Sequence, residues 1–234
     1  MKNKLMLLTA ASAFSMAGIA ADYTNIVLIN LDDVGYGDFS FNGAYGYTTP
    51  NIDKMAAEGV RFTHFLAGQP ISGASRAGLL TGCYPNRIGF AGAPGPDSNY
   101  GIHPDEMTIA EVLKQKGYST AIFGKWHLGS QKEFLPLQNG FDEYYGLPYS
   151  NDMWPFHPQQ GEVFNFPDLP TYDGNEIIGY NTDQTRFIPP VLLISSRRIR
   201  ISLSSCIWLI ICPMYRWPFP INSRERASRV YMAT

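Results

Sequence analysis

Hydrophobic and polar residues follow one another along the first two thirds of the chain in short blocks that predict alternating strands and helices. Residues 26–31 form a nearly continuous apolar run, which is typical of a strand buried on both faces of a parallel sheet. Residues 52–58 have the spacing of a short helix that ends at Gly59, and residues 60–67 have strand character. These blocks predict a first strand, helix and strand.

The alternation continues after this unit. A helix is expected over residues 74–80, and a second over 108–117, where Thr108 and Glu111 stand at the spacing of a capping box. Residues 118–123 form the next apolar strand. This order predicts an α/β fold in which helices cross over between the strands of one sheet.

Polar residues that could carry chemistry follow two of these strands. Asp32 and Asp33 come after the first strand, and Lys125 and His127 lie in the loop after the last. Sheets of this class bind ligands outside the carboxyl ends of their strands, so these side chains are expected at one edge. Residues 140–183 are rich in Pro, Tyr, Asn and Asp and predict long surface loops, where substrate contacts are common.

Length and composition set the domain organisation. The chain has 234 residues, 45% of them apolar, which suits one domain. Residues 1–20 have a basic start, an apolar centre and a small-residue cleavage site, so they predict a bacterial signal peptide and a periplasmic or secreted protein. Residues 21–185 are then the domain proper. No membrane span is expected after removal of the signal, because the apolar segments are too short.

The charge differs between the two parts of the chain. Residues 1–185 carry 10 Lys and Arg against 19 Asp and Glu, whereas residues 186–234 carry eight Arg, no Lys and one Glu. The three cysteines, Cys83, Cys206 and Cys212, have no metal-binding spacing, and no nucleic-acid motif is present. The two parts therefore look like unrelated proteins.

Each candidate residue also has an ordinary structural interpretation. Paired aspartates often form a solvated turn, but two carboxylates at the end of a buried strand suit a calcium or magnesium ion. Lys125 and His127 could belong to a packed loop or to a catalytic site. Ser72 could cap a helix, or it could be the reacting atom beside Arg76, where a helix start favours anions.

Four ordered blocks resemble the type I sulfatases. The stretch "SGASRAGLLTG" is similar to the family signature, (Cys or Ser)-x-(Pro or Ala)-x-Arg followed by Leu-Thr-Gly, with Ser72 at the modified position and Arg76 at the arginine. The other blocks are "NIVLINLDDVGYGD", "TTPNIDKMAAEGVRFTHF" and "AIFGKWHLG", and "GLPYSNDM" is similar to a segment of the family's arylsulfatases. The resemblance covers residues 23–185.

The resemblance implies an alkaline-phosphatase-like α/β fold, with a mixed, largely parallel sheet flanked by helices and incomplete in this chain. It implies that a serine-type maturase oxidises Ser72 to formylglycine before export, and that Asp32, Asp33 and the residue at position 72 bind Ca²⁺. Arg76 would hold the formylglycine, Lys125 the sulfate and the formylglycine, and His127 would act as the base of the elimination step. The substrate would be a sulfated small molecule or glycan.

The family pattern stops near residue 185. Sulfatases continue with an Asp-Asn metal pair, another histidine and a distal lysine, and none of these follows residue 185. Regrouping the possible codons one base earlier recovers a string that resembles the family's next block, "LAHNMPH", at residues 208–214. Lysine codons read one base out of frame give arginine, which accounts for the arginines and the absence of lysine after residue 185. We therefore expect a frameshift near residue 185, an out-of-frame tail over 186–234 and an inactive chain.

Two other functions are compatible with the same residues. One is a hydrolase of the same superfamily that cleaves phosphate or phosphonate esters. The other is a secreted remnant that binds sulfated glycans without catalysis. Sulfate and phosphate release from matched aryl esters would distinguish the two hydrolases, and binding without maturation would favour the remnant.

Overall fold

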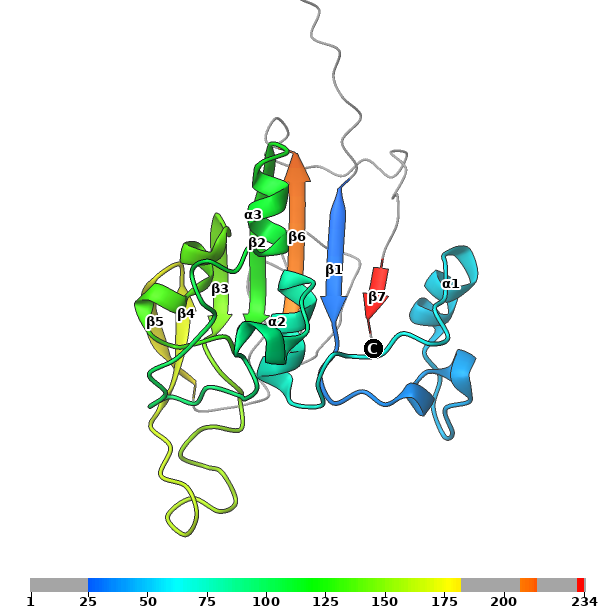
Figure 1. Ribbon diagram of the computed structural model, residues 1–234. Coiled ribbons are helices and arrows are strands. Elements are labelled where there is room, and N and C mark those ends of the chain that lie inside the picture. The colour runs from blue at the N-terminus through cyan, green and yellow to red at the C-terminus, as the bar shows by residue number, and fades with distance from the viewer. Residues whose placement is uncertain (1–24, 182–206, 214–230, 234) are drawn as a thin grey trace, which may run out of the picture.

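The computed structural model describes residues 25–181, 207–213 and 231–233 (Figure 1). The predicted signal peptide, residues 1–20, lies outside them. The described part forms one sheet whose strands are β1 (Ile26–Asn30), β2 (Tyr118–Lys125), β3 (Glu143–Leu147), β4 (Leu169–Asp173), β5 (Glu176–Asn181), β6 (Ile207–Pro213) and β7 (Tyr231–Ala233). Its α-helices are α1 (Pro50–Glu58), α2 (Ser72–Thr81) and α3 (Ile109–Lys114). None of the helices in these ranges is long and apolar enough to cross a membrane.

The strand order across the sheet is β5-β4-β3-β2-β6-β1-β7. β6 lies between β1 and β2 and is antiparallel to both, so β1 and β2 run in the same direction and end at the same edge (Figure 1). β2–β3 and β1–β7 are parallel pairs, whereas β3–β4 and β4–β5 are antiparallel. The sheet is mixed, as predicted, but antiparallel pairs outnumber parallel ones among the described strands, contrary to the expectation of a largely parallel sheet.

α2 packs closely on the sheet because its inward face is made of small residues. Ala74, Ala77 and Leu80 belong to the same buried core as Ile122 of β2. A Cβ atom on Gly73 would lie 2.7 Å from the carbonyl oxygen of Gly92, so only glycine fits there. The same Cβ would lie 3.0 Å from the carbonyl oxygen of His127, just beyond β2, so Gly73 lets the start of α2 approach the carboxyl edge of the sheet.

α3 begins where the sequence predicts. The side chain of Thr108 accepts a hydrogen bond from the Glu111 backbone at 3.2 Å, and Glu111 Oε2 accepts one from the Thr108 backbone at 2.7 Å. Thr108 Oγ1 also donates to the carbonyl of Asn139 at 2.9 Å. The predicted capping box is therefore confirmed, and it also ties α3 to the segment before β3.

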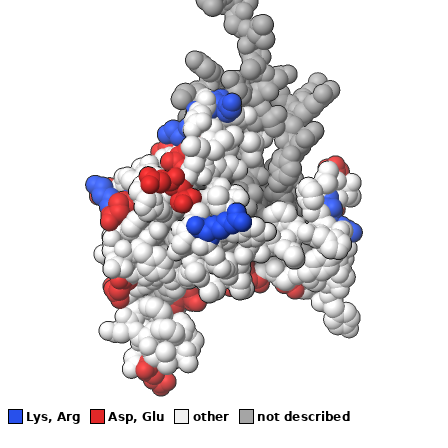
Figure 2. Space-filling model, in the orientation of Figure 1, with Lys and Arg blue, Asp and Glu red and all other residues white. Residues whose placement is uncertain are grey.

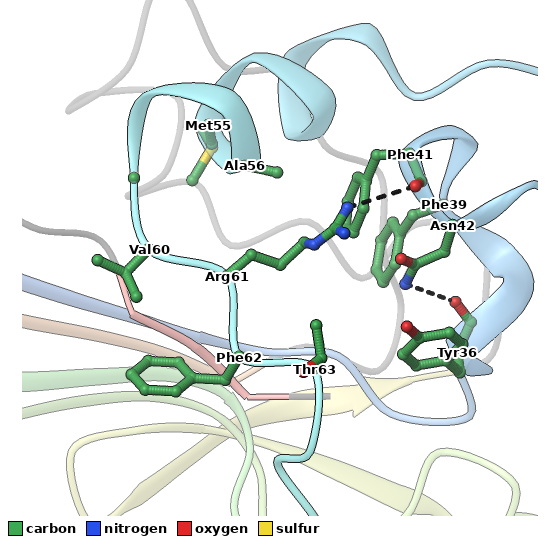
Figure 3. A pocket seen from close by; sticks show the side chains of 11 residues that line it. Tyr36, Phe39, Phe41, Asn42, Met55, Ala56, Val60, Arg61, Phe62 and Thr63 are labelled. Carbon is green, nitrogen blue, oxygen red and sulfur yellow. Dashed lines mark hydrogen bonds between the residues drawn. The ribbon is translucent and has the colours of Figure 1, made fainter.

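α1 and the segments around it form a separate layer at the right of Figure 1. No residue of α1 is buried. Figure 3 shows the cavity of about 60 Å³ between α1 and its neighbours, in which the Arg61 guanidinium lies 5.3 Å from the centre of the Phe41 ring. The strand predicted for residues 60–67 is wrong: this segment has no regular structure and lines one side of the cavity. Among the described residues no strand pairs with its backbone.

Two further expectations need correction. The segment over residues 140–183 contains β3, β4 and β5 rather than loops alone. β4 and β5 form a hairpin whose turn has Gly174 at a φ of 60°, so "DGN" at residues 173–175 is a hairpin signal. β1 is only half-buried along its length, although its apolar run predicts burial on both faces.

Candidate active site

Five predicted site residues converge at the carboxyl edge of the sheet. Asp32 follows β1, Ser72 and Arg76 lie on α2, and Lys125 and His127 lie at the end of β2 and just beyond it. Hydrogen bonds link all five side chains. The expectation that the ends of the first and last predicted strands meet is therefore confirmed.

Ser72 lies at the centre of this cluster. Its Oγ donates a hydrogen bond to Asp32 Oδ2 at 3.0 Å, accepts one from Arg76 Nε at 3.1 Å and lies 3.3 Å from His127 Nδ1. Ser72 is the first helical residue of α2, and the cap position before it is Ile71. The interpretation of Ser72 as an ordinary helix cap is therefore wrong, because its hydroxyl points to residues from other elements.

Asp32 is the shared anion of the site. Its Oδ2 accepts hydrogen bonds from Lys125 Nζ at 2.6 Å and from Arg76 Nη2 at 2.9 Å, in addition to the Ser72 hydroxyl. Burial acts to raise the pKa of Asp32, but the charges of Arg76 and Lys125 outweigh it and lower the pKa to about 2. Asp32 is therefore a carboxylate under all physiological conditions.

The two cations are held in place by groups of the sheet edge. Arg76 is 1% exposed, and its Nη1 donates to the backbone carbonyl of Lys125 at 2.6 Å. Lys125 Nζ also donates to Ser150 Oγ at 3.0 Å. Burial and the nearby Arg76 charge lower the pKa of Lys125, whereas Asp32 acts to raise it. Two cations beside one carboxylate leave a local excess of positive charge that suits an anionic ligand.

Ser150 is a site residue that the sequence analysis missed. It lies in "GLPYSNDM", after β3, and its side chain is buried against Lys125. The parallel pairing of β2 with β3 brings it there, since both strands end at the same edge. The signal for it in the sequence is a serine three residues after the end of an apolar strand, once that strand is known to pair beside β2.

His127 has a constrained backbone and an unsatisfied ring nitrogen. Its φ is 64°, and its backbone amide donates to the carbonyl of Pro148 at 3.0 Å. Burial, followed by the charges of Lys125 and Arg76, lowers its pKa to about 3, so the ring is neutral. Nε2 is buried and has no hydrogen-bond partner among the described residues. A buried, unpaired nitrogen of a neutral imidazole can accept or relay a proton.

Asp33 is separate from this network. Its side chain is exposed and lines a groove of about 730 Å³ together with Asp32, Ser72 and Arg76. Its φ is 56°, and among described non-glycine residues only Asp33 and His127 have positive φ. Such strained residues cluster at functional sites. Within the described ranges no three His, Cys, Asp or Glu side chains come together as a metal site, so Asp32 and Asp33 alone do not form a complete one.

Comparison with known proteins gives a family match. The sulfatase family model matches residues 24–188. The chain is 48% identical over 154 residues to arylsulfatase A of Bos taurus, which covers 64% of this chain and 30% of that protein. It is 39% identical over 185 residues to N-acetylgalactosamine-6-sulfatase of Mus musculus, which covers 76% of this chain and 34% of that protein. The chain thus spans about a third of the length of these relatives.

Solved structures show the same likeness in three dimensions. The crystal structure of Ps i-CgsB is 35% identical with a TM-score of 0.58, covering 66% of this chain and 37% of that one. A structure described under the metabolism of multiple glycosaminoglycans by Bacteroides thetaiotaomicron is 32% identical with a TM-score of 0.57, covering 69% of this chain and 33% of that one. Both likenesses rest on part of the larger protein only.

Proposed function

This chain belongs to the sulfatase family, and from that premise we propose that it is the amino-terminal part of an exported hydrolase of sulfate esters whose nucleophile derives from Ser72. The observation that carries the proposal is the position of Ser72 Oγ, within hydrogen-bond distance of Asp32, Arg76 and His127. A nucleophile needs a proton acceptor and charge stabilisation at one point, and both are present there.

A plain serine hydroxyl attacks sulfur poorly, so the proposal includes oxidation of Ser72 to formylglycine by a serine-type maturase before export. The hydrated aldehyde carries two hydroxyls, one to displace the alcohol from sulfur and one to expel sulfate later. Ser75 lines the same groove but lacks the Ala and Arg spacing of the signature. The modification should therefore be confined to Ser72.

The roles of the remaining residues follow from their contacts. Arg76 would hold the group at position 72 through Nε, and Lys125 would neutralise a sulfate oxygen while Ser150 orients its ammonium group. His127 would take the proton of the hydroxyl at position 72 through Nδ1, the ring atom 3.3 Å from Ser72 Oγ. The neutral state of its ring suits this role as a base.

We also propose that Asp32, Asp33 and the oxygen at position 72 bind Ca²⁺. Carboxylate oxygens are the donors that calcium prefers, and both aspartates border the groove beside Ser72. A bound ion would supply Lewis-acid activation of the sulfate oxygens. Calcium takes six to eight oxygens, so Asp32, Asp33 and the group at position 72 would need further oxygen donors to complete its coordination.

The substrate class is supported by the relatives. One relative is named for N-acetylgalactosamine-6-sulfate hydrolysis, and a second Ps i-CgsB structure, 36% identical with a TM-score of 0.57, is a complex with k-i-k-neocarrahexaose. Sulfated glycans are therefore the proposed substrates. Export is proposed from residues 1–20, and amino-terminal sequencing of the secreted protein should begin near Ala21.

Mass spectrometry tests the nucleophile. After co-expression of the 234-residue chain with a serine-type maturase, the tryptic peptide of residues 62–76 should lose two hydrogens at Ser72. A Ser75→Ala variant should be modified equally, and a Ser72→Ala variant should not be modified. A preparation that releases sulfate while Ser72 remains a serine would contradict the mechanism.

A second proposal concerns the reading frame of the last 49 residues, 186–234. Residues 186–234 are proposed to be out of frame, because the charge pattern changes there and the family match ends at residue 188. The 234-residue chain should then be inactive, and restoring one base should give calcium-dependent sulfate release from aryl sulfates in preference to the matched phosphates. Resequencing of the gene should show whether the shift lies in the gene itself or in the recorded sequence. A soluble, monomeric 234-residue protein with a cooperative melt and sulfatase activity of its own would overturn the proposal.

A further inference from the structure

The loop between β3 and β4 extends beyond the carboxyl edge of the sheet, on the same side as the candidate active site (Figure 1). It has a rigid base, since Leu147 and Tyr149 before it and Leu169 after it form a buried cluster of their own. Met153 and Trp154 pack against this cluster. The first residues of the loop are therefore fixed relative to the sheet.

The same residues connect the loop to the active site. Ser150 Oγ accepts a hydrogen bond from Lys125 Nζ, and the backbone amide of Met153 donates to the carbonyl of Ser150 at 3.1 Å. A Cβ on Gly95 would be 3.7 Å from the Met153 sulfur, and the neighbouring Ala93 lies against the start of α2. The loop thus starts beside Lys125, the proposed sulfate-binding lysine.

Five aromatic side chains line the loop, and together they are called the aromatic wall: Trp154, Phe156, His157, Phe164 and Phe166. Trp154 and Phe156 meet edge to face with centroids 4.9 Å apart. Phe164 and Phe166 stack at 4.8 Å with 14° between their planes. His157 contacts both of them edge-on, at 4.8 Å and 5.7 Å.

Hydrogen bonds within the loop hold the part of the wall around Phe166, while Trp154 packs on the buried cluster at the base of the loop. The Gln160 side chain bonds to both the carbonyl and the amide of Phe166, at 3.1 Å and 3.0 Å. Gly161 donates to the carbonyl of Phe164 at 2.7 Å. Nevertheless Phe156 is 65% exposed and Phe164 is 37% exposed. Ordered aromatic rings that remain open to water are a pattern typical of binding surfaces.

The charge of the loop restricts what it can bind. Residues 148–168 contain no Lys or Arg and three acids, Asp152, Glu162 and Asp168. The lower loop in Figure 2 likewise shows red but no blue on the visible face. A surface of this charge repels sulfate groups. Its ligand should therefore be apolar or neutral, unlike the anion expected at Lys125.

We propose that the aromatic wall binds an uncharged pyranose ring linked to the sulfated unit. The inference rests on the proposed function, which places the sulfate at Lys125 and a glycan beside it. The C–H face of a pyranose carries partial positive charge and suits the negative face of an aromatic ring. The substrate class is therefore a sparsely sulfated oligosaccharide, whose neutral neighbouring sugar lies on Phe156, rather than a densely sulfated chain.

Calorimetric titration of the 234-residue chain tests this with three hexasaccharides: a neutral galactan, its singly sulfated form and heparin. The neutral sugar should bind, and Phe156→Ala should weaken it about 2- to 10-fold, the value of one aromatic contact. Phe156→Leu, which keeps apolar volume without a ring face, should weaken it similarly. Tyr45→Ala removes a 98% exposed aromatic far along the chain and should leave binding unchanged. Heparin should bind less tightly than the singly sulfated sugar.

Normal binding by both Phe156 variants, or tighter binding of heparin, would overturn the proposal. So would a change in oligomeric state on Phe156→Ala with unaltered sugar affinity, because the wall would then be a contact between two copies of the chain. Neutral sugar binding does not depend on Ser72. If the wall binds the neutral sugar but Ser72 is never modified, the proposed function fails and the proposal for the wall stands. If Ser72 is modified but the wall does not bind the neutral sugar, only the proposal for the wall fails.

Discussion

Two helices of nearly equal length, α1 with nine residues and α2 with ten, differ in how much of each is buried. α1 has no buried residue, although its sequence has an apolar side. α2 has five buried residues, among them Arg76. The difference shows that helical periodicity alone does not place a helix against the core. In α2, small residues allow the close approach that does.

The comparison also separates two uses of arginine. Arg61, after α1, lies over the Phe41 ring and donates a 3.4 Å hydrogen bond to the Phe41 carbonyl, in an exposed setting (Figure 3). Arg76 is buried and bonds to Asp32, Ser72 and Lys125. The first arginine lines a surface cavity, whereas the second links the side chains of the candidate active site by hydrogen bonds.

The largest expected effect comes from removing the buried cation. Arg76→Met leaves the Asp32 carboxylate without one of its two cations and should cost about 3–5 kcal/mol of unfolding free energy, measured by urea denaturation. Lys54→Met in α1 is the matched control, because the Lys54–Glu58 pair is exposed and 3.8 Å apart. It should change stability by less than about 0.5 kcal/mol. Equal effects would show that α1 is as integral as α2.

Shortening an apolar side chain should also destabilise the protein more in α2 than in α1, but by less than the loss of Arg76. Leu80→Ala in α2 removes a side chain that is 1% exposed and should cost about 3 kcal/mol. Met55→Ala in α1 trims a half-buried side chain that lines the small cavity, and about 1 kcal/mol is expected. The same urea midpoints give both values. A larger loss for Met55 would mean that α1 packs into a core of its own.

A change at the start of α3 extends the comparison to a third helix, which lies on the same side of the sheet as α2. Thr108→Ala removes one half of the capping box and the bond to Asn139, and about 1–2 kcal/mol should be lost. Thr108→Ser retains the hydroxyl and should recover most of this loss. Thermal denaturation followed by circular dichroism measures both variants. An unchanged melting temperature in the alanine variant would contradict the role of the cap.

The smallest effect concerns pH. Burial acts to raise the pKa of Asp142, but the Lys114 ammonium at 2.7 Å and bonds from Thr120 outweigh it, so the pKa lies below its usual 3.8. A lowered folded pKa stabilises the protein above pH 3.8, and this stability is lost as the pH falls through the folded value. Asp142→Asn should therefore cost less than about 1 kcal/mol at pH 7. Urea titrations at pH 7 and pH 3 should show this difference shrinking; a difference that grows in acid would contradict the assignment.

Much of the site-bearing half of the fold is predictable from the sequence. β1, α2, α3 and β2 lie close to their expected positions, because apolar runs and the Thr108 cap are local signals. The meeting of Asp32 with Lys125 follows from one rule about strand ends. The segment over 60–67 was wrongly expected to be a strand, because strand character says nothing about whether a partner strand is available.

Other parts of the site depend on contacts far apart in the sequence. Ser150 reaches Lys125 only because β3 pairs beside β2, and the sequence does not specify that register. The left-handed backbone of Asp33 and His127 is equally hidden, since neither residue is glycine. Close approach at Gly73 is a third example, visible only once Gly92 is placed beside it.

The location of β6 has a consequence for the time course of folding. Among the described residues β1 pairs only with β6 and β7, and β6 begins 82 residues after β2 ends. At about 5–20 residues per second, synthesis of that interval takes about 4–16 s, during which β1 and one edge of β2 have no strand beside them. Pairing between such distant segments is intrinsically slow. β6 and β7 both lie in the segment proposed to be out of frame, so restoring the frame would replace them with other strands. With either sequence, the nascent chain is expected to need shielding by a chaperone until the strands that cover β1 emerge.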